Sequence, residues 1–432
     1  MHLYDLPLIF ALVGLALYTV LAGADFGAGL WQLTATGRPG AEPIREHAHR
    51  SMGPVWEANH VWLIFVLTVT WTAYPTAFGS IASTLSVPLF VAALGIIFRG
   101  AAYALRSGAS GPSEVSRIDT VFGVSSILTP FALGAAVGGI ASRRVPVGNA
   151  AGDLWSSWTG PTSILAGLLA VTTAAYLAAV YLSADAVRLA QPDLARRFRA
   201  RALGTGVVSG AVALGGLAVL HSDARPLYQG LVQGDGLPAL IVSVVAGVCT
   251  LVLVWRERFE PARYAAALAV AAIVAGWALA QNPTLLPGLT VQQAASPHDT
   301  LVGLVVAVLA GGAILFPSLA LLFRLALRGQ LHPEPEAAVP SPVPRRALLS
   351  ASAPGLGGRS AAACLVVGFG LLTVADAGWA HAIGVVALLG FVFVGFFAVA
   401  PDQLASQPTL EPRAHRPTSP GAGPTTTSRE AE

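Results

Sequence analysis

The first two long apolar stretches of this chain contain ionisable side chains well suited to chemistry: Asp25 in the first stretch, and Glu57 and His60 in the second. An ionisable group in an apolar run is costly to bury and therefore marks a candidate functional position. A carboxylate or an imidazole in such a place can take up and release a proton. The chemistry that these residue types predict is proton transfer.

Asp25 belongs to the segment GADFGAG, residues 23–29, and lies about eight residues, or roughly 12 Å, before the end of its apolar run. The small residues around it, Gly27 among them, allow neighbouring backbones to approach closely. Two interpretations of Asp25 are open. It is either a proton-carrying group or a structural carboxylate bonded to a neighbouring helix.

The second cluster is GPVWEANHVWLI, residues 53–64, in which Trp56 and Trp62 flank Glu57, Asn59 and His60. Glu57 and His60 are three residues apart, so they share one face of a helix. An early glutamate also suits the positive end of a helix dipole, which is the structural alternative for Glu57. A di-iron site needs two such Glu-x-x-His pairs and two further carboxylates. One pair is present, so we expect no metal site.

Composition predicts that membrane-spanning helices position these residues. Hydrophobic residues make up 54% of the chain and charged residues 11%, against about 25% charged in an ordinary soluble domain. Solid apolar runs exclude an open sheet in lipid. The fold class that follows is an all-α polytopic membrane protein in a lipid bilayer. The nine runs of about 20 residues or more are 6–33, 56–74, 83–105, 118–141, 160–184, 203–221, 237–255, 262–281 and 301–327.

Arginines predict how these helices are oriented. Every Lys or Arg position in the chain is an arginine, and the segments after the first, third, fifth and seventh runs contain fourteen of them, with Arg99 counted as a loop residue. The alternate loops contain three. Arginine-rich loops face the cytoplasm, so we expect a multi-pass protein of the cell membrane with its N-terminus outside. The charges lie in short loops, and we therefore expect no nucleic-acid partner.

This orientation places Asp25 and Glu57 in the cytoplasmic half of the membrane. Asp119, at the start of the fourth run, and Asp185, at the end of the fifth, fall on the same side. A graded set of carboxylates suits a proton path from the cytoplasm. For Asp119 and Asp185 we favour the alternative interpretation, in which they are solvated helix ends.

After the ninth run the composition changes. The sequence predicts a membrane domain over residues 1–328, a proline-rich cytoplasmic linker over 329–358, an extra transmembrane hairpin of two helices over 359–400 and a disordered tail over 401–432. Asp376 and His381 fall near the turn of the hairpin and are interpreted as a loop-facing pair.

Three motifs resemble those of one known family. Residues 53–64 are similar to the pattern Gly-Pro-x-Trp-(Asp/Glu)-x-Asn-x-Val-Trp-Leu in the second helix of cytochrome bd-type quinol oxidase subunit II. Residues 24–27 look like its first-helix motif, and Phe98-Arg99-Gly100 resembles a third. The resemblance implies nine helices, arranged as two four-helix halves plus one. The extra hairpin lies outside the family pattern.

The resemblance also implies a heterodimer. A haem-bearing subunit I would oxidise quinol and reduce oxygen to water, with haems b and d, or b only, in that partner. This chain would bind no haem alone and contain no catalytic residue. Residues at the positions of Asp25 and Glu57 are associated with proton supply, and His60 is a candidate to share the proton with Glu57. Trp56, Asn59, Trp62, Gly27 and Arg99 are the motif residues with a structural role.

Two other functions remain open at the level of sequence. A secondary transporter can use buried carboxylates such as Asp25 and Glu57 as ion-coupling sites, although transporters usually contain broken helices near the membrane centre. A purely structural subunit, in which both carboxylates are dispensable, is the third hypothesis.

Overall fold

The computed structural model describes residues 2–36, 40–52, 56–106, 108, 111–327, 356–374 and 377–399. The predicted linker up to residue 355, the predicted tail from residue 401 and Asp376 lie outside these ranges. The chain divides into two compact units, Met1–Gln330 and Leu331–Glu432, and each is described by itself. The bounds of the four segments proposed from the sequence stay predictions.

Each of the nine predicted runs coincides with a long helix, which confirms the fold class. In eight of these helices the described residues meet the length and hydropathy of a membrane span, and α3 contributes the shorter apolar stretch Asn59–Ala73. Proline at the first or second position starts several of them, where its missing N–H costs nothing. The helices are α1 (Leu6–Ala35), α3 (Trp56–Ala73), α5 (Ser86–Arg106), α6 (Pro112–Ala141), α7 (Pro161–Arg188), α8 (Pro192–Asp223), α10 (Leu237–Trp255), α11 (Phe259–Gln281) and α13 (His298–Leu327).

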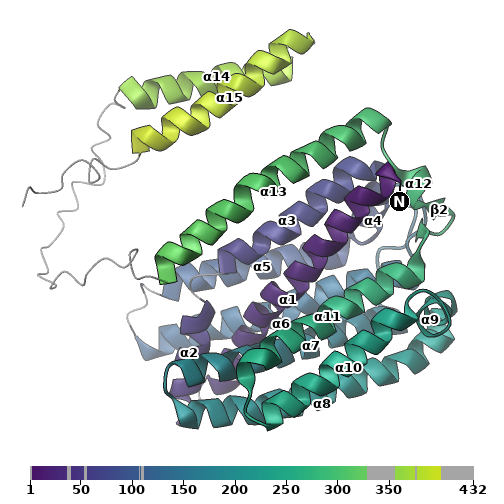
Figure 1. Ribbon diagram of the computed structural model, residues 1–432, viewed down its shortest axis with the longest axis vertical. Coiled ribbons are helices and arrows are strands. Elements are labelled where there is room, and N and C mark those ends of the chain that lie inside the picture. Colours follow the sequence, from purple (N-terminus) through teal and green to yellow (C-terminus); the bar gives the residue numbers. More distant parts are fainter. Residues whose placement is uncertain are drawn as a thin grey trace, which may run out of the picture. The chain divides into compact units, whose positions relative to one another are not determined.

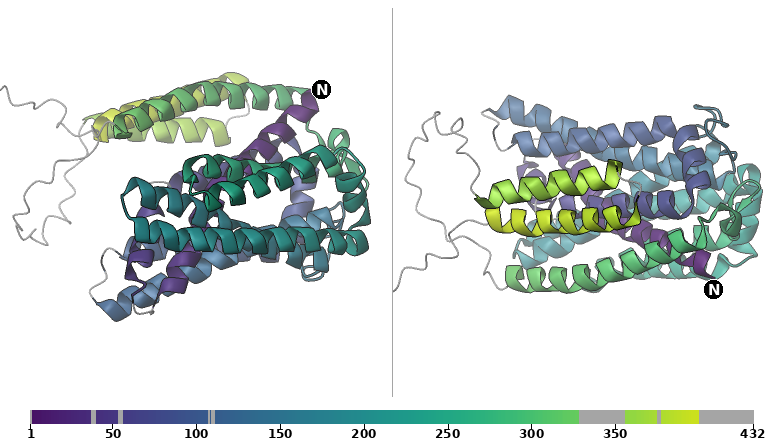
Figure 2. Two further views of the ribbon diagram at one scale, coloured as in Figure 1. Left: turned by 60° about the horizontal axis from the view of Figure 1, so that its bottom comes forward. Right: turned by 90° about the horizontal axis from the view of Figure 1, so that it is seen from above.

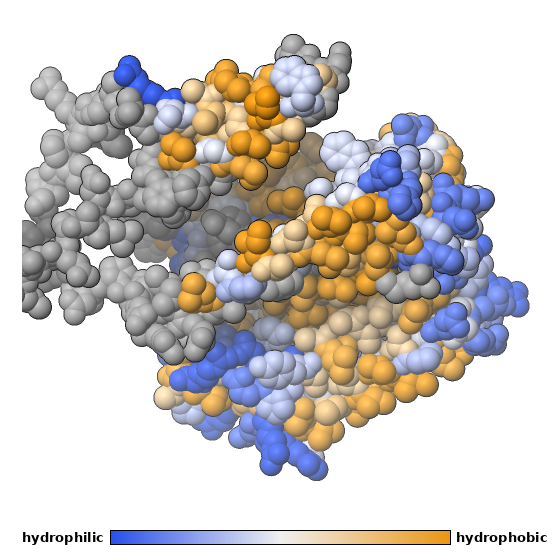
Figure 3. Space-filling view, turned by 45° about the horizontal axis from the view of Figure 1, so that its top comes forward, coloured by the Kyte–Doolittle hydropathy of each residue, from blue (hydrophilic) through white to orange (hydrophobic). Residues whose placement is uncertain are grey.

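Short elements close the two ends of this bundle (Figures 1 and 2). The helix α2 (Glu42–Met52) lies at one end, where α5 ends and α6 begins. At the opposite end lie the 3₁₀ turn Leu3–Asp5, α4 (Pro75–Thr84), α9 (Arg225–Val232), α12 (Val291–Ala294) and a hairpin of β1 (Thr284–Leu286) and β2 (Leu289–Thr290), whose strands pair antiparallel. Hydrophobic side chains cover the middle of the visible helices and hydrophilic ones gather towards their ends (Figure 3), which is the pattern of a membrane-spanning bundle.

The helix α1 is central to the first unit, because it packs against α2, α3, α6, α7 and α11. Close packing with α7 depends on Gly27. A Cβ atom at this position would lie 1.9 Å from the carbonyl oxygen of Ala174 in α7. The small residues around Asp25 therefore bring α1 and α7 into backbone contact, as the sequence pattern predicts.

The second unit contains a helical hairpin of α14 (Leu356–Val374) and α15 (Gly378–Val399), which pack against each other. Gly368 of α14 allows this contact, since a Cβ atom there would lie 2.7 Å from Leu388 of α15. The predicted pair of helices is therefore present, and their crossing of a membrane stays a prediction, because the described residues contain only the shorter apolar stretches Arg359–Gly368 and Ala382–Phe391. The side chain of His381 lies outside the described residues, so the interpretation of Asp376 and His381 as a loop-facing pair stays a prediction.

Candidate functional site

Asp25 forms a buried ion pair with Arg99 of α5. The Nη1 atom of Arg99 donates to Asp25 Oδ2 at 2.6 Å, and Nη2 donates to Oδ1 at 2.7 Å and to the Asp25 carbonyl at 3.0 Å. Both side chains are 2% exposed. A bidentate arginine–carboxylate pair is among the strongest and most directional polar contacts in proteins. It ties α1 to α5 below the surface of the bundle.

The surroundings of Arg99 reinforce this pair. Arg99 Nε donates to the hydroxyl of Ser126 in α6 at 3.0 Å, so the guanidinium joins three helices. Its central carbon lies 4.8 Å from the ring centre of Phe26 and 4.7 Å from that of Phe122, within range for cation–π attraction. The two rings cover the guanidinium with apolar surface. The arrangement favours fixed charges at this depth.

Residues of the α3 motif contact α1 close to Asp25. Asn59 is buried, and its Nδ2 atom donates to the carbonyl of Leu21 in α1 at 3.3 Å. The ring of His60 is edge-on to Tyr18 and to Phe26, with 6.1 Å between ring centres in each pair. Phe26 thus contacts both His60 and Arg99.

Of the other motif residues of α3, the structure describes the side chain of Trp62. Trp62 packs beside the buried cluster around Tyr18 and Phe26. The side chains of Trp56 and Glu57 lie outside the described residues, although both positions belong to α3. Their predicted roles stay predictions.

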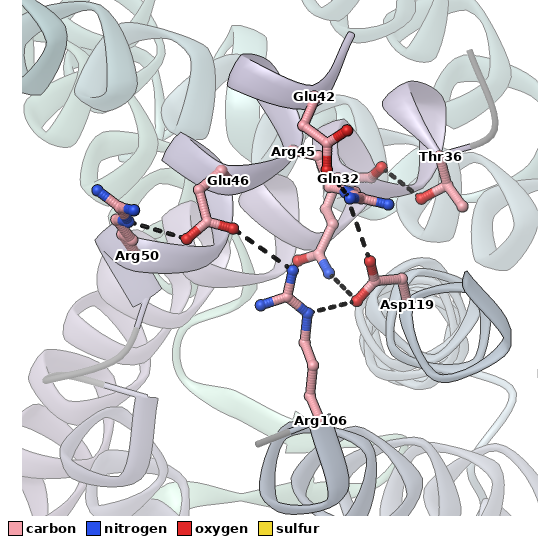
Figure 4. Close-up of polar contacts among 8 residues, drawn as sticks. All are labelled: Gln32, Thr36, Glu42, Arg45, Glu46, Arg50, Arg106 and Asp119. Atoms are coloured by element: carbon pink, nitrogen blue, oxygen red, sulfur yellow. Dashed lines mark hydrogen bonds and ion pairs between the residues drawn. The ribbon is translucent and has the colours of Figure 1, made fainter. Parts of the chain in front are cut away.

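A second buried carboxylate, Asp119, lies in α6 beneath α2 (Figure 4). Its side chain is 0% exposed. The Nε2 atom of Gln32 donates to Asp119 Oδ1 at 2.7 Å, and Arg106 Nε donates to the same oxygen at 2.8 Å. The Nε atom of Arg45, in α2, lies 3.7 Å from Asp119 Oδ2. Four elements, α1, α2, α5 and α6, therefore meet at this carboxylate.

Each arginine of this cluster also contacts a glutamate of α2. Arg45 is bonded to Glu42, and Arg106 Nη2 lies 3.6 Å from Glu46 Oε2. The side chains of Arg45 and Arg106 are 19% and 15% exposed, whereas those of Glu42 and Glu46 are 76% and 40% exposed. The arginines thus connect a buried carboxylate to carboxylates at the surface.

Two groups of α2 have shifted pKa values. Burial opposes the charged form of Glu46, but its hydrogen bond from Arg50 and the positive charges of Arg106 and Arg50 outweigh that effect and lower its pKa. Burial and the charge of Arg106 lower the pKa of His49, whose ring lies 5.5 Å from that of Tyr103. Both shifts favour the forms present at neutral pH, a charged Glu46 and a neutral His49.

One interpretation of the sequence is wrong and one count needs correction. Asp119 is not a solvated helix end, because α6 begins at Pro112, about two turns earlier, and α2 covers the carboxylate. Arg99 was counted among the loop arginines, but it lies inside α5 and is 1% exposed. Removing Arg99 from the count leaves the direction of the arginine bias unchanged.

Asp185 differs from Asp119 in exposure. Its side chain is 25% exposed and contacts Arg188 at 3.5 Å and Arg263 at 3.6 Å. It lies near the end of α7, where the sequence analysis places it.

Gln32, Arg45 and Arg106 are site residues that sequence reasoning missed. A glutamine near the end of an apolar run is one signal that was available for Gln32. The sequence around Arg45 and Arg106 indicates only the orientation of their loops. In the part of the chain that the structure describes, no group of three or more His, Cys, Asp or Glu side chains is arranged to hold a metal ion.

Comparisons with known proteins agree on one family. The profile of the family described as "Cytochrome bd terminal oxidase subunit II" matches residues 3–326. The chain is 20% identical over 328 residues to the "Putative cytochrome bd menaquinol oxidase subunit II" of Bacillus subtilis (strain 168), covering 73% of this chain and 93% of that protein. It is 30% identical over 133 residues to the "Cytochrome bd ubiquinol oxidase subunit 2" of the same organism, covering 31% and 38%.

The fold is similar to that of a solved oxidase. A chain in the structure of bd oxidase from Geobacillus thermodenitrificans superimposes with a TM-score of 0.61 at 26% sequence identity. The superposition covers 76% of this chain and 99% of that chain. The matched part therefore corresponds to a whole subunit of that oxidase.

Proposed function

Since the chain belongs to the cytochrome bd terminal oxidase subunit II family, we propose that it is the haem-free subunit of a quinol-oxidising, oxygen-reducing membrane complex. The partner is a haem-bearing subunit I, which carries haems b and d, or b only, and performs the redox chemistry. This chain supports that subunit and helps to supply protons from the cytoplasmic side. It is not catalytic alone.

One observation carries the proton-supply role: a fully buried Asp119 is connected to the surface through partly exposed arginines. The exposed side-chain fraction rises from 0% at Asp119 to 15% at Arg106 and 40% at Glu46. Arginine keeps its charge at any relevant pH and holds the carboxylates in place, while the carboxylates exchange protons. A proton from the cytoplasm therefore has an entrance under α2.

The inner part of the path follows α1. Gln32, which is bonded to Asp119, lies seven residues after Asp25, so the two occupy the same face of the helix about two turns apart. Glu57 and His60 of α3 remain proposed proton-carrying groups, and the ring of His60 lies beside Tyr18 and Phe26 of α1. Quinol and oxygen would react on the partner, and protons would pass through this chain towards it.

Asp25 has two proposed roles within this path. As a relay it would have to leave Arg99 before it accepts a proton, because protonation would remove the charge that pairs with a buried guanidinium. As a fixed charge it holds α1, α5 and α6 together beside the path. The bidentate geometry supports the second role. We therefore propose Asp119 as the group that takes up protons.

Purification of the chain tests the proposal. A tagged chain, expressed with a candidate subunit I and extracted in mild detergent, should bring down a partner whose visible spectrum shows haem. The same chain expressed alone should show none. A haem spectrum from the chain alone, or solute uptake by vesicles that contain only this chain, would contradict the proposal. The second outcome would support the transporter hypothesis.

A further inference from the structure

Three buried polar atoms around Asp119 have no hydrogen-bond partner among the described residues. They are Gln32 Oε1, Arg45 Nε and Asp119 Oδ2. Gln32 and Asp119 are each 0% exposed. Buried polar atoms in folded proteins are almost always hydrogen-bonded, to protein or to ordered water. Three such atoms at one carboxylate require a common explanation.

The distance between Arg45 Nε and Asp119 Oδ2 limits the explanations. At 3.7 Å it exceeds the range of a direct N–H···O hydrogen bond. A polar contact of this length is typical of a pair that shares a bridging water. Closing the pair directly would satisfy these two atoms, but Gln32 Oε1 would still be buried without a partner.

We infer that this site binds one ordered water molecule. The water accepts a hydrogen bond from Arg45 Nε and donates its two hydrogens to Asp119 Oδ2 and Gln32 Oε1. Buried waters typically make about three hydrogen bonds, and this arrangement supplies three. The other polar atoms of the site, Gln32 Nε2 and Asp119 Oδ1, are bonded to each other, so they do not compete for the water.

The helix α2 covers the site (Figure 4). Arg45 extends from it towards Asp119, and Ile44 and Ala48 of the same helix are buried. His49, one turn after Arg45, has a buried Nδ1 atom that also has no hydrogen-bond partner among the described residues. A further polar atom of α2 is therefore left without a described partner.

The water deepens the proposed function and, as a proton donor to Asp119, rests on it. A carboxylate under a helix exchanges protons with the cytoplasm only through hydrogen-bonded neighbours, and Arg45 and Arg106 keep their protons. The water is the neighbour that can give a proton to Asp119, and it regains one from further water on the cytoplasmic side. Gln32 is then a positioning residue, because it orients the water and does not itself titrate.

A density map of the assembled complex, at a resolution that shows ordered waters, tests the site. The expected peak lies within hydrogen-bond distance, about 2.7–3.2 Å, of Arg45 Nε, Asp119 Oδ2 and Gln32 Oε1. It should be lost in Gln32→Leu and kept in Thr36→Val. The hydroxyl of Thr36 donates to the backbone carbonyl of Gln32, so Thr36→Val is a matched control about one turn further along the chain. A direct Arg45–Asp119 contact without a peak would overturn the inference.

Oxygen consumption by the same complexes separates the site from the function. Gln32→Leu should lower turnover by about three- to tenfold per haem, less than the roughly 100-fold or more of a lost proton-transfer group, because Asp119 remains. The loss of turnover in Gln32→Leu should grow as pH rises, whereas Thr36→Val should have the turnover of wild type. If Gln32→Leu loses the density peak but keeps wild-type turnover, the water is not a proton donor to Asp119 and has only a structural role. Unchanged haem content is required in both variants.

Discussion

Asp25 and Asp119 are both buried carboxylates paired with arginines, but only one of them is fully satisfied. Both oxygens of Asp25 receive hydrogen bonds from Arg99, which phenylalanine rings cover. Asp119 is bonded through one oxygen, and its other oxygen lies 3.7 Å from Arg45. The same residue types thus form a closed ion pair inside the bundle and an open cluster near its arginine-rich end.

This difference in hydrogen bonding suggests that Asp25 stabilises the fold and that Asp119 transfers protons. A carboxylate that is held on both oxygens gains little by accepting a proton, because its arginine would lose its counter-charge. The two arginines of Asp119 have alternative partners in Glu42 and Glu46. Protonation of Asp119 therefore leaves neither arginine without a carboxylate. The closed pair suits a fixed support, and the open cluster suits proton uptake.

The largest effect is expected for Asp25→Asn. Asparagine keeps one acceptor oxygen but no charge, so the buried Arg99 loses its bidentate partner, a change that costs about 3–5 kcal/mol in comparable pairs. We expect loss of most of the assembled complex, measured as haem per tagged chain after purification.

The double variant Asp25→Asn with Arg99→Met is the control for this prediction. It removes both charges and places an unbranched apolar side chain where the buried guanidinium was, and it should recover assembly with turnover within about twofold of wild type. Full assembly of the double variant with strongly reduced turnover would show instead that Asp25 carries protons. That is the first of the two interpretations of its sequence pattern.

A smaller loss is expected for Gly27→Ala. The added Cβ atom meets the carbonyl oxygen of Ala174, so α1 and α7 must separate next to the closed pair. Overpacking of this kind costs about 1–3 kcal/mol. The thermal unfolding midpoint of the complex should fall, while Gly210→Ala, where no atom lies near the new Cβ, should leave it nearly unchanged. Equal midpoints for the two variants would count against the close contact.

The open cluster should respond to acid. Because the pKa of His49 is lowered in the folded protein, protons bind the unfolded state more readily once pH falls below about 6.5, and stability is lost as pH drops towards the lowered value. Glu46, with a lowered pKa, loses its contribution at still lower pH. The groups that face His49 are Glu46, Arg106 and Asp119. The unfolding midpoint should fall more between pH about 7.5 and pH about 5.5 in wild type than in His49→Gln. An equal fall in the two proteins would show that His49 does not cause the loss of stability in acid.

The smallest effect is expected for Asp185→Asn. This carboxylate lies at the arginine-rich end but is a quarter exposed, and its contacts with Arg188 and Arg263 are 3.5 Å and 3.6 Å long. Exposed ion pairs contribute about 0–1 kcal/mol. Stability and turnover should both remain close to wild type. A turnover loss as large as that of an Asp119 variant would place a second proton entrance at α7.

The long helices could be predicted because their signal is local. Apolar runs of about 20 residues identify spans without knowledge of their neighbours, and each predicted run is a helix. The short helices α2 and α4 were not predicted, since the amphipathic segment Glu42–Met52 and the small-residue segment Pro75–Thr84 are stabilised by packing at the ends of the bundle.

Partners across helices could not be predicted in the same way. Asp25 is identified from its place in an apolar run, but its partner Arg99 is 74 residues away. The motif around Arg99 indicates a structural role and does not say which carboxylate it pairs with. Asp119 looks like a helix end in the sequence because the apolar run begins next to it. In the structure α6 begins before that run, and α2 folds over the carboxylate. Which carboxylate is closed and which is open depends on three-dimensional contacts between segments far apart in the chain.

Oxygen consumption by the complex with Asp119→Asn tests the central claim most directly. At saturating quinol and equal haem content, we expect turnover to fall about 100-fold or more at neutral pH, the loss typical of a removed proton-transfer group. Assembly should remain, since Arg45 and Arg106 keep contacts with Glu42 and Glu46. Wild-type turnover in a fully assembled Asp119→Asn complex would contradict the account.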